Sequence, residues 1–258
     1  MMRYLRWISI LGLLVVLTAC GGDAPPVERS ASPLPADSDQ LLTVVTADDA
    51  AISGTLRRYQ REQGEWQPVG GPMAIVVGRT GLAWGRGLAT ENPVDGPVKR
   101  EGDGKSPSGM FDLGPVFGFA PAAEMGWLRM PYLAVEEMTE CVDDPGSDHY
   151  NRIVSRGSVD SVDWSSSEKM LAVGAQYALG VVVEHNWDDP VAGGGSCIFL
   201  HIWGGRTVPT VGCTAMSEND LRTVAGWLDS ARRPVLVQLT AAGYAAARDS
   251  WGLPAIAP

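Results

Sequence analysis

The sequence has little positive charge, few histidines and no long apolar run. Its 20 Lys and Arg residues stand against 30 Asp and Glu, for a net charge of -10 at pH 7, which argues against a nucleic acid partner bound through its phosphate backbone. The three histidines, His149, His185 and His201, form no His-Glu-x-x-His pattern and no close pair, so we expect no metal site. The stretch GDGKSP (102–107) lacks the upstream glycine of a phosphate-binding loop, so we expect no nucleotide or other cofactor.

The N-terminal segment 1–19 is typical of an export signal. Arg3 and Arg6 precede an apolar run from Trp7 to Leu17, which is too short to span a bilayer comfortably. The run leads into LTAC, which resembles the lipobox of bacterial lipoproteins, where the cysteine, here Cys20, becomes an acylated N-terminus after cleavage. The resemblance implies an exported protein held in the cell envelope by a lipid anchor, facing the periplasm from the outer membrane if the host is Gram-negative.

The rest of the chain divides into a tether and one domain. Residues 20–40 are rich in Pro, Ser, Ala and Asp and have no apolar periodicity, so we expect a lipidated N-terminus followed by a disordered tether. The composition is 45% hydrophobic and shows no internal repeat or coiled-coil heptad. We therefore expect a single folded domain over residues 41–258.

Residue patterns predict a mainly β fold with a few helices. Ser165 precedes Glu168 by three residues, a capping-box spacing that predicts a short helix over 165–177. Ser217 with Asp220 predicts the start of a second helix, with an apolar stripe from Leu221 to Leu228. Strands are expected at 41–49, within 55–69 as a hairpin turning at Gly64, within 73–88 as two short strands, and at 178–185, 196–202 and 234–239.

A histidine and a cysteine lie at the end of this pattern, in HIWGGRTVPTVGC (201–213). Period-two alternation in the strand 196–202 places His201 on the face opposite Ile198, Leu200 and Ile202. Cys213 follows Gly212, which removes side-chain bulk beside the sulfur and leaves backbone N–H groups for a developing oxyanion. Cys213 is thus a candidate nucleophile with His201 as its base. Spacing alone leaves open that both are ordinary packing residues.

The remaining cysteines bear on this choice. An exported chain cleaved at Cys20 also holds Cys141, Cys197 and Cys213, and an unpaired thiol in an oxidising compartment is a liability unless it is used or shielded. One possibility is a disulfide between Cys141 and Cys197, which would leave Cys213 free and hold the segment 141–151 over the site.

At these residues the chain resembles the L,D-transpeptidase catalytic domain family (YkuD-like), whose signature is a histidine at a strand end followed by Ser-x-Gly-Cys. His201, Gly212 and Cys213 match this signature, with Thr210 in place of the serine. A second block, EGDGKSPSGMFDLG (101–114), resembles the family's upstream Gly-x-Thr-Pro-x-Gly-x-Phe segment. The two blocks occur in the family's order.

The resemblance implies a β-sandwich-like catalytic domain that acts on peptidoglycan peptide stems. Cys213 would attack the L-centre carbonyl of a diamino acid in a tetrapeptide stem, His201 would act as base, and Gly212 and Thr210 would support the oxyanion site. The family's Arg after the cysteine is missing, because Thr214 and Ala215 follow Cys213. Candidates for the substrate contact are Trp203 and an arginine, either Arg206 or Arg222.

Other functions stay open at this stage. If water resolves the thioester, the same thiol makes an L,D-carboxypeptidase. A different class is a non-catalytic peptidoglycan-binding lipoprotein, for which the missing Arg would mark lost activity. A papain-like peptidase is disfavoured because such enzymes place Cys before His in the chain, the reverse of the order of His201 and Cys213.

Overall fold

The structure is a computed structural model and describes residues 32–256. The expected export signal 1–19 and the lipidation site Cys20 lie outside the described residues. Within 32–256 the fold is mainly β with two α-helices, α1 (Glu218–Trp227) and α2 (Ala241–Trp251). Neither helix in this part of the chain has the length and apolar character needed to cross a membrane.

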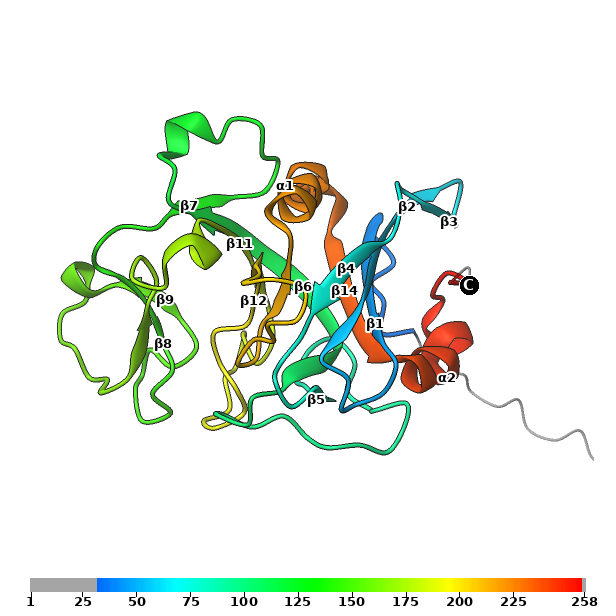
Figure 1. Cartoon of the computed structure of the whole chain (residues 1–258), viewed down its shortest axis with the longest axis horizontal. Helices are drawn as coiled ribbons and strands as arrows, with labels where there is room; N and C mark the ends of the chain where they lie inside the picture. The colour runs from blue at the N-terminus through cyan, green and yellow to red at the C-terminus, as the bar shows by residue number, and fades with distance from the viewer. Residues whose placement is uncertain (1–31, 257–258) are drawn as a thin grey trace, which may run out of the picture. The chain divides into compact units, whose positions relative to one another are not determined.

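Eleven strands of residues 32–256 form one sheet, in the order β1-β14-β6-β11-β12-β13-β4-β2-β3 with β5 and β7 attached to β6. β1 also pairs with β2, so the path closes on itself (Figure 1). The strands are β1 (Gln40–Thr46), β2 (Ser53–Glu62), β3 (Glu65–Pro68), β4 (Met73–Val76), β5 (Leu82–Trp84), β6 (Ser106–Gly118), β7 (Tyr132–Ala134), β11 (Leu179–Val183), β12 (Phe199–Ile202), β13 (Thr214–Met216) and β14 (Pro234–Thr240).

Both faces of the central strands are buried, which explains their nearly continuous apolar sequences. Leu42 in β1 and Leu236 in β14 contribute to one core, which α1 helps to cover through Val224. The alternate residues of the same strands form a second core with Tyr244 and other residues of α2. Full burial of one such leucine contributes roughly 1.5–3 kcal/mol. A third cluster, on the outer side of β6, β11 and β12, surrounds Cys213.

The predicted second helix is confirmed. α1 begins after Ser217, whose hydroxyl accepts the backbone N–H of Asp220, and its buried residues include Leu221 and Val224. The hairpin also forms, with β2 and β3 joined at Gly64, where φ is +87°. Helix α2 was not predicted; it is capped by the Thr240 side chain and ends at Gly252, where φ is +67°.

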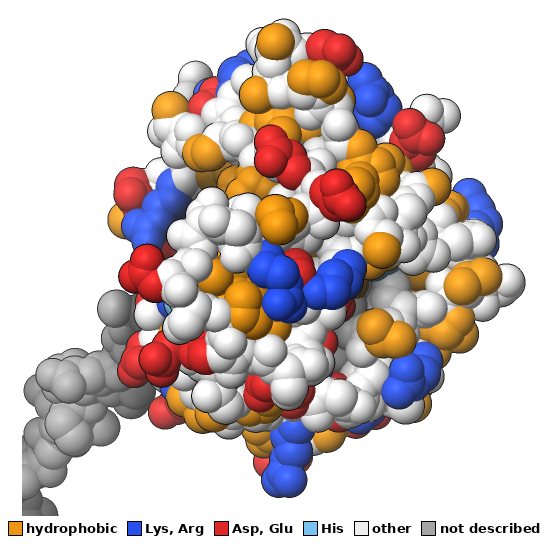
Figure 2. Space-filling model, turned by 90° about the vertical axis from the view of Figure 1, so that its left-hand side faces the viewer, with side chains coloured by type: hydrophobic (Ala, Val, Ile, Leu, Met, Phe, Trp, Pro, Cys, Tyr) orange, Lys and Arg blue, Asp and Glu red, His pale blue; other side chains and the backbone are white. Residues whose placement is uncertain are grey.

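A second sheet of three strands lies beside the first, at the left of Figure 1. It consists of β8 (Thr139–Val142), β9 (Ile153–Ser155) and β10 (Ser167–Lys169), with β8 in the middle. Glu140 in β8 is buried and accepts hydrogen bonds from side chains on both sides, among them Arg156 and Lys169. The space-filling view of this side shows basic, acidic and hydrophobic side chains mixed (Figure 2).

The predicted helix over 165–177 is wrong. The region contains β10 and a short 3-10 helix, η3 (Gly174–Tyr177). Ser165 does not cap a helix, because both its N–H and its hydroxyl donate to the Asp144 carboxylate. Glu168 lies instead in register with Cys141 of β8. Ser165 and Glu168, whose spacing predicts a capping box, therefore belong to the attachment of β10 to β8.

Two boundaries differ from those expected. Residues 32–40 of the expected tether are packed: Leu34 is buried in the core under α2, and Gln40 begins β1. The packed part of the chain therefore starts before residue 41. The strand expected at 196–202 begins only at Phe199, since Cys197 has a φ of +54° that a regular strand does not allow.

Candidate active site

His201 lies in β12, and Cys213 comes directly before β13, the parallel neighbour of β12. His201 in β12 pairs with Ala215 in β13, and Cys213 comes two residues before Ala215, so both side chains are on the same face. The alternation expected from the sequence is confirmed, because Leu200 is in the core and Phe199 is in the cluster around Cys213. The two candidate catalytic groups are thus neighbours on one surface of the sheet.

The two sequence blocks meet at the main-chain carbonyl of Cys213. Ser106, at the start of β6, donates its hydroxyl to this oxygen at 2.7 Å and accepts the Gly78 N–H at 2.9 Å. Thr210 donates to the same oxygen at 2.6 Å and accepts the Gly212 N–H at 3.1 Å. Thr210 therefore fixes the turn that leads into the cysteine.

This arrangement limits the expected oxyanion donors. The N–H of Gly212 already donates to the Thr210 hydroxyl. A Cβ at Gly212 would meet only ordinary contacts at 3.5 Å, so packing does not require glycine there. The N–H of Cys213 is the other backbone donor beside the sulfur, and Gly212 and Thr210 serve as support.

The Cys213 sulfur is held in a shielded place. Cys213 is the free cysteine of the described residues and is 4% exposed. Its sulfur accepts the Phe199 N–H at 3.3 Å and donates to the Cys197 carbonyl at 3.4 Å. Burial raises the pKa of Cys213 to about 12, and the nearby Glu168 carboxylate adds to this rise. The thiol is therefore neutral at pH 7 in this state.

His201 has the tautomer of a base. Its Nδ1 lies 2.8 Å from the Ile202 carbonyl oxygen, which only accepts, so Nδ1 carries the proton and Nε2 has the free electron pair. Burial lowers the pKa of His201, opposed by this hydrogen bond. The imidazole ring meets the Tyr177 ring edge-on at 5.4 Å between centroids. His201 is thus neutral and oriented.

Cavities lie on two sides of Cys213. The first, about 280 Å³, is lined by Cys213, His201, Tyr177, Trp203 and Thr210 among others. The second, about 180 Å³, is lined by Cys213 together with Arg79, Lys99, Glu101, Asp143 and Glu168 among others. Cys213 thus lines both cavities, as does Glu168.

The predicted substrate contacts are only partly at these cavities. Trp203 lines the first one. Arg206 stacks on Trp203 at 5.8 Å but is not among the lining residues, and Arg222 stacks on Trp127 at 5.0 Å. Arg79 is the arginine that lines a cavity together with Cys213. No sequence pattern predicts this placement of Arg79, since nothing in the chain order connects it with the cysteine.

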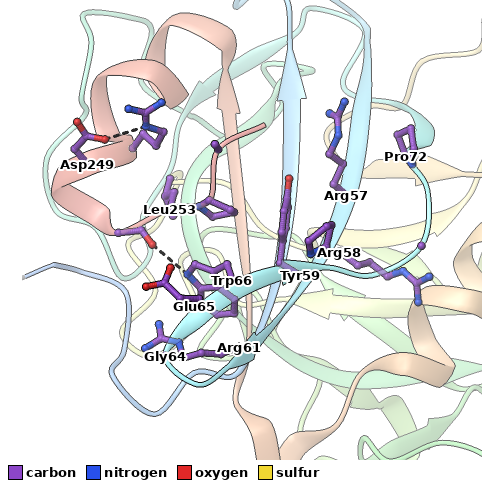
Figure 3. Close-up of a pocket in the computed structure, with 16 residues that line it drawn as sticks. Arg57, Arg58, Tyr59, Arg61, Gly64, Glu65, Trp66, Pro72, Asp249 and Leu253 are labelled. Atoms are coloured by element: carbon purple, nitrogen blue, oxygen red, sulfur yellow. Dashed lines mark hydrogen bonds and ion pairs between the residues drawn. The ribbon is translucent and has the colours of Figure 1, made fainter. Parts of the chain in front are cut away.

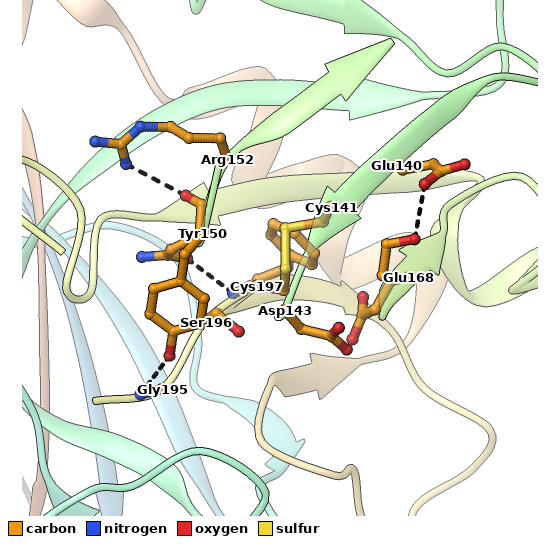
Figure 4. Close-up of a disulfide and its surroundings, with 12 residues drawn as sticks. Glu140, Cys141, Asp143, Tyr150, Arg152, Glu168, Gly195, Ser196 and Cys197 are labelled. Atoms are coloured by element: carbon orange, nitrogen blue, oxygen red, sulfur yellow. Dashed lines mark hydrogen bonds between the residues drawn. A yellow bond between two sulfur atoms is a disulfide. The ribbon is translucent and has the colours of Figure 1, made fainter. Parts of the chain in front are cut away.

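Cys141 and Cys197 form a disulfide, the pairing that was one possibility from the sequence. The bridge ties β8 to the segment before β12 (Figure 4). Cys213 lies beside it, because its thiol donates to the Cys197 carbonyl at 3.4 Å. On the same side, Tyr150 donates to Glu101 at 2.5 Å. The three-stranded sheet is thereby fixed against the candidate site, and Asp143 and Glu168 reach the second cavity.

A larger cavity of about 920 Å³ lies between the β2–β3 hairpin and the end of α2 (Figure 3). Arg61 stacks on the Trp66 ring there at 4.6 Å, and Arg248 pairs with Asp249 at 2.9 Å. Neither Cys213 nor His201 lines this cavity. Its size alone assigns no chemistry, so the candidate active site is the one at Cys213.

No protein-family model and no curated protein matches the chain. Among solved structures, the chain matches the helical cell shape determining protein Pgp2 from Campylobacter jejuni, with 17% sequence identity and a TM-score of 0.38. The match covers 78% of this chain and 48% of that chain, so it spans about half the length of the matched protein. What the site does has to be inferred from its own residues.

Proposed function

We propose that this chain is a cysteine acyltransferase with an L,D-transpeptidase-like catalytic domain, acting on tetrapeptide stems of peptidoglycan in cell-wall cross-linking or remodelling. The observation that carries the proposal is that a free cysteine, directly before β13, and an oriented histidine in the adjacent β12 line a common cavity. The hydroxyls of Ser106 and Thr210 support the backbone at the same cysteine.

The first half-reaction forms a thioester. Because thiol and imidazole are both neutral, the Cys213 proton passes to His201 Nε2 as the sulfur attacks the stem carbonyl. The Cys213 N–H stabilises the oxyanion. As the tetrahedral intermediate collapses, the C–N bond to the terminal D-alanine breaks, and the leaving amine takes the proton from His201. The acyl group stays on the sulfur.

The second half-reaction releases the acyl group. An amine from another stem, or water, attacks the thioester with His201 taking the proton, and the Cys213 thiol is restored. The cavities on two sides of the sulfur support separate approaches for the acyl donor and the second reactant. An amine gives a cross-link, whereas water gives L,D-carboxypeptidase activity.

Arg79 replaces Arg206 and Arg222 as our candidate for the substrate carboxylate. A guanidinium binds a carboxylate through paired hydrogen bonds. Arg79 lines the second cavity together with Cys213, whereas Arg206 and Arg222 line neither cavity beside Cys213 and stack instead on Trp203 and Trp127. Trp203 remains a candidate for apolar contact with the stem, because it lines the first cavity next to His201.

The proposed location is the cell envelope, with Cys20 as the lipidated residue. The support is the LTAC sequence after a short apolar run. In a bacterial host, the wild-type chain should incorporate a labelled fatty acid and partition with membranes, and Cys20→Ala should do neither. Equal labelling of the two chains would exclude Cys20 as the anchor.

The test of activity uses the full chain with Cys20→Ser, so that it is not acylated. The protein is incubated with a disaccharide-tetrapeptide, and intact mass and released D-alanine are measured beside Cys213→Ala. We expect a thioester adduct or D-alanine release that disappears with Cys213→Ala, and the product then distinguishes transfer from hydrolysis. If both signals are absent from folded protein whose Cys213 thiol is reduced, the result favours a non-catalytic peptidoglycan-binding protein.

A further inference from the structure

Glu168 is an acidic side chain at the candidate site for which the proposed mechanism has no use. It lies on β10 in the three-stranded sheet and lines both cavities beside Cys213. Its Oε2 accepts a hydrogen bond from the Tyr177 hydroxyl at 2.6 Å. The disulfide of Cys141 holds this strand in place, since Glu168 is in register with Cys141.

Tyr177 connects Glu168 with the catalytic pair. Its ring packs edge-on against His201 and Phe199, and its hydroxyl donates to the Glu168 carboxylate. Tyr177 also lies in one packed cluster and one cavity lining with Cys213, close enough that the thiol adds to the rise that burial causes in the pKa of Tyr177. A tyrosine hydroxyl has one proton to donate. In the structure this proton goes to the Glu168 carboxylate, so the Tyr177 hydroxyl has none left to donate to the neighbouring Cys213.

Charged groups from several elements face Glu168. Asp143, after β8, and Glu101, before β6, raise the pKa of Glu168, although burial is the main cause. Together these effects bring it to about 7, with the Tyr177 hydrogen bond opposing the rise. The other ionisable groups around the two cavities are Arg79, Lys99, Tyr177, His201 and Cys213.

We propose that Glu168 is a positioning residue that controls, through the direction of the Tyr177 hydroxyl, whether Cys213 is held as a thiol or supported as a thiolate. With an ionised Glu168, the Tyr177 hydroxyl donates to the carboxylate and offers the sulfur only a lone pair. With a protonated Glu168, the carboxyl donates to the tyrosine oxygen, and the tyrosine hydroxyl donates to the sulfur.

The proton count closes without a further reactant. When Cys213 is activated, its S–H bond breaks and the proton forms an N–H bond at His201 Nε2. The Tyr177 proton and the Glu168 proton stay on their own oxygens and only change the direction of their hydrogen bonds. Glu168 thus tunes the thiolate without joining the acyl transfer.

The inference deepens the proposed function, but it is tested without any substrate. The rate of iodoacetamide alkylation at Cys213 is measured on the full chain from pH 5 to pH 9, with the adduct located by peptide mass. We expect the logarithm of the alkylation rate, plotted against pH, to rise with unit slope as the thiolate fraction grows. The curve should flatten near pH 7, where Glu168 ionises, and then rise again with unit slope. Glu168→Gln should give one straight line, roughly tenfold faster than wild type above pH 8, which corresponds to one unit of thiol pKa.

Matched variants separate this relay from simpler explanations. Asp143→Asn should keep the flattening but move it to lower pH, because a neighbouring negative charge is removed. His201→Gln should also keep it, since the titrating group is Glu168. In a Tyr177→Phe background, the effect of Glu168→Gln should fall well below tenfold.

The proposal is overturned if the wild-type curve of alkylation rate against pH shows no flattening, or if wild type and Glu168→Gln are alkylated at equal rates. It is also overturned if Glu168→Gln changes the alkylation rate by the same factor in the Tyr177→Phe background as in wild type. The last result would mean that charge alone acts on the sulfur. If Glu168→Gln does not fold, the wild-type curve and the His201→Gln curve still decide the question. Loss of acyl transfer with these alkylation results intact would refute the proposed function but not the relay.

Discussion

The replacement Glu140→Gln tests how the three-stranded sheet is held beside the candidate site. Glu140 is the centre of this sheet: its carboxylate accepts from Arg156 at 2.6 and 3.0 Å, from Trp164 at 2.9 Å and from Ser167 at 2.7 Å, and it also pairs with Lys169. These hydrogen bonds, led by that of Arg156, hold the pKa of Glu140 well below its usual range. Glutamine keeps the shape but brings an amide N–H₂ group to face these donors.

The expected loss of stability in Glu140→Gln depends on how exposed Arg156 and Lys169, the charged partners of Glu140, are to water. Breaking a buried ion pair by removing one partner costs about 3–5 kcal/mol. The Glu140 side chain is 2% exposed, but those of Arg156 and Lys169 are 36% and 54% exposed, so water solvates them after the change. We therefore expect a loss of about 2–3 kcal/mol in the free energy of unfolding. For a domain of this size, that lowers the melting temperature by roughly 5–10 °C.

The assay is thermal unfolding followed by circular dichroism at pH 7, with Glu137→Gln as the matched control. Glu137 is exposed and lies three residues away in the same segment, so its replacement should change the melting temperature by less than about 2 °C. Because the folded pKa of Glu140 is depressed, its contribution is present above the unfolded value of 4.5 and is lost as the pH falls below it. The gap between wild type and Glu140→Gln should therefore shrink in acid. A melting temperature equal to that of wild type at pH 7 would refute the reasoning.

Other predictions concern the groups around Cys213. Thr210→Val removes hydrogen bonds on both sides of the hydroxyl and should cost about 1–3 kcal/mol in urea unfolding, while Thr210→Ser should cost less than about 1; equal losses would contradict this. Burial lowers the pKa of His185 to about 4, so stability should be complete above pH 6.5 and fall by about 3 kcal/mol toward pH 4, a fall that His185→Gln should lack. Reducing the Cys141–Cys197 bridge, which spans 56 residues, should cost about 4 kcal/mol, and an unchanged denaturation midpoint under reductant would argue against a stabilising role.

Local sequence patterns predict the structure correctly where the feature depends on the residues of a single helix or strand. The start of α1 follows from Ser217 and Asp220, which are three residues apart and need no other part of the chain. The opposite faces of Leu200 and His201 follow from alternation within one strand. The mainly β class follows in the same way, from many short apolar runs separated by turns.

Patterns failed where a distant partner changes the role of a residue. Ser165 has the position of a helix cap, but Asp144, 21 residues earlier, binds both its hydroxyl and its N–H. Ser106 was part of a recognised block, yet its hydrogen bond to the Cys213 carbonyl spans 107 residues. Tyr177 and Glu168 were read as members of one helix. Their role at the sulfur depends on a strand pairing that no local signal reveals.

The buried state of Cys213 limits the kind of catalysis that the site can support. Reactive cysteines usually have a lowered pKa because a positive group or a helix N-terminus stabilises the thiolate. Here burial raises the pKa of Cys213 and lowers that of His201, so a resting ion pair between them is disfavoured from both sides. In the mechanism that we propose, proton transfer therefore accompanies attack on the substrate, and donors to the developing thiolate gain importance. The Phe199 N–H already donates to the sulfur, and the Tyr177 hydroxyl, which donates to Glu168 in the structure, is the second donor that we propose. A shielded neutral thiol also resists oxidation, as the export that we propose for this chain would require of an unpaired cysteine.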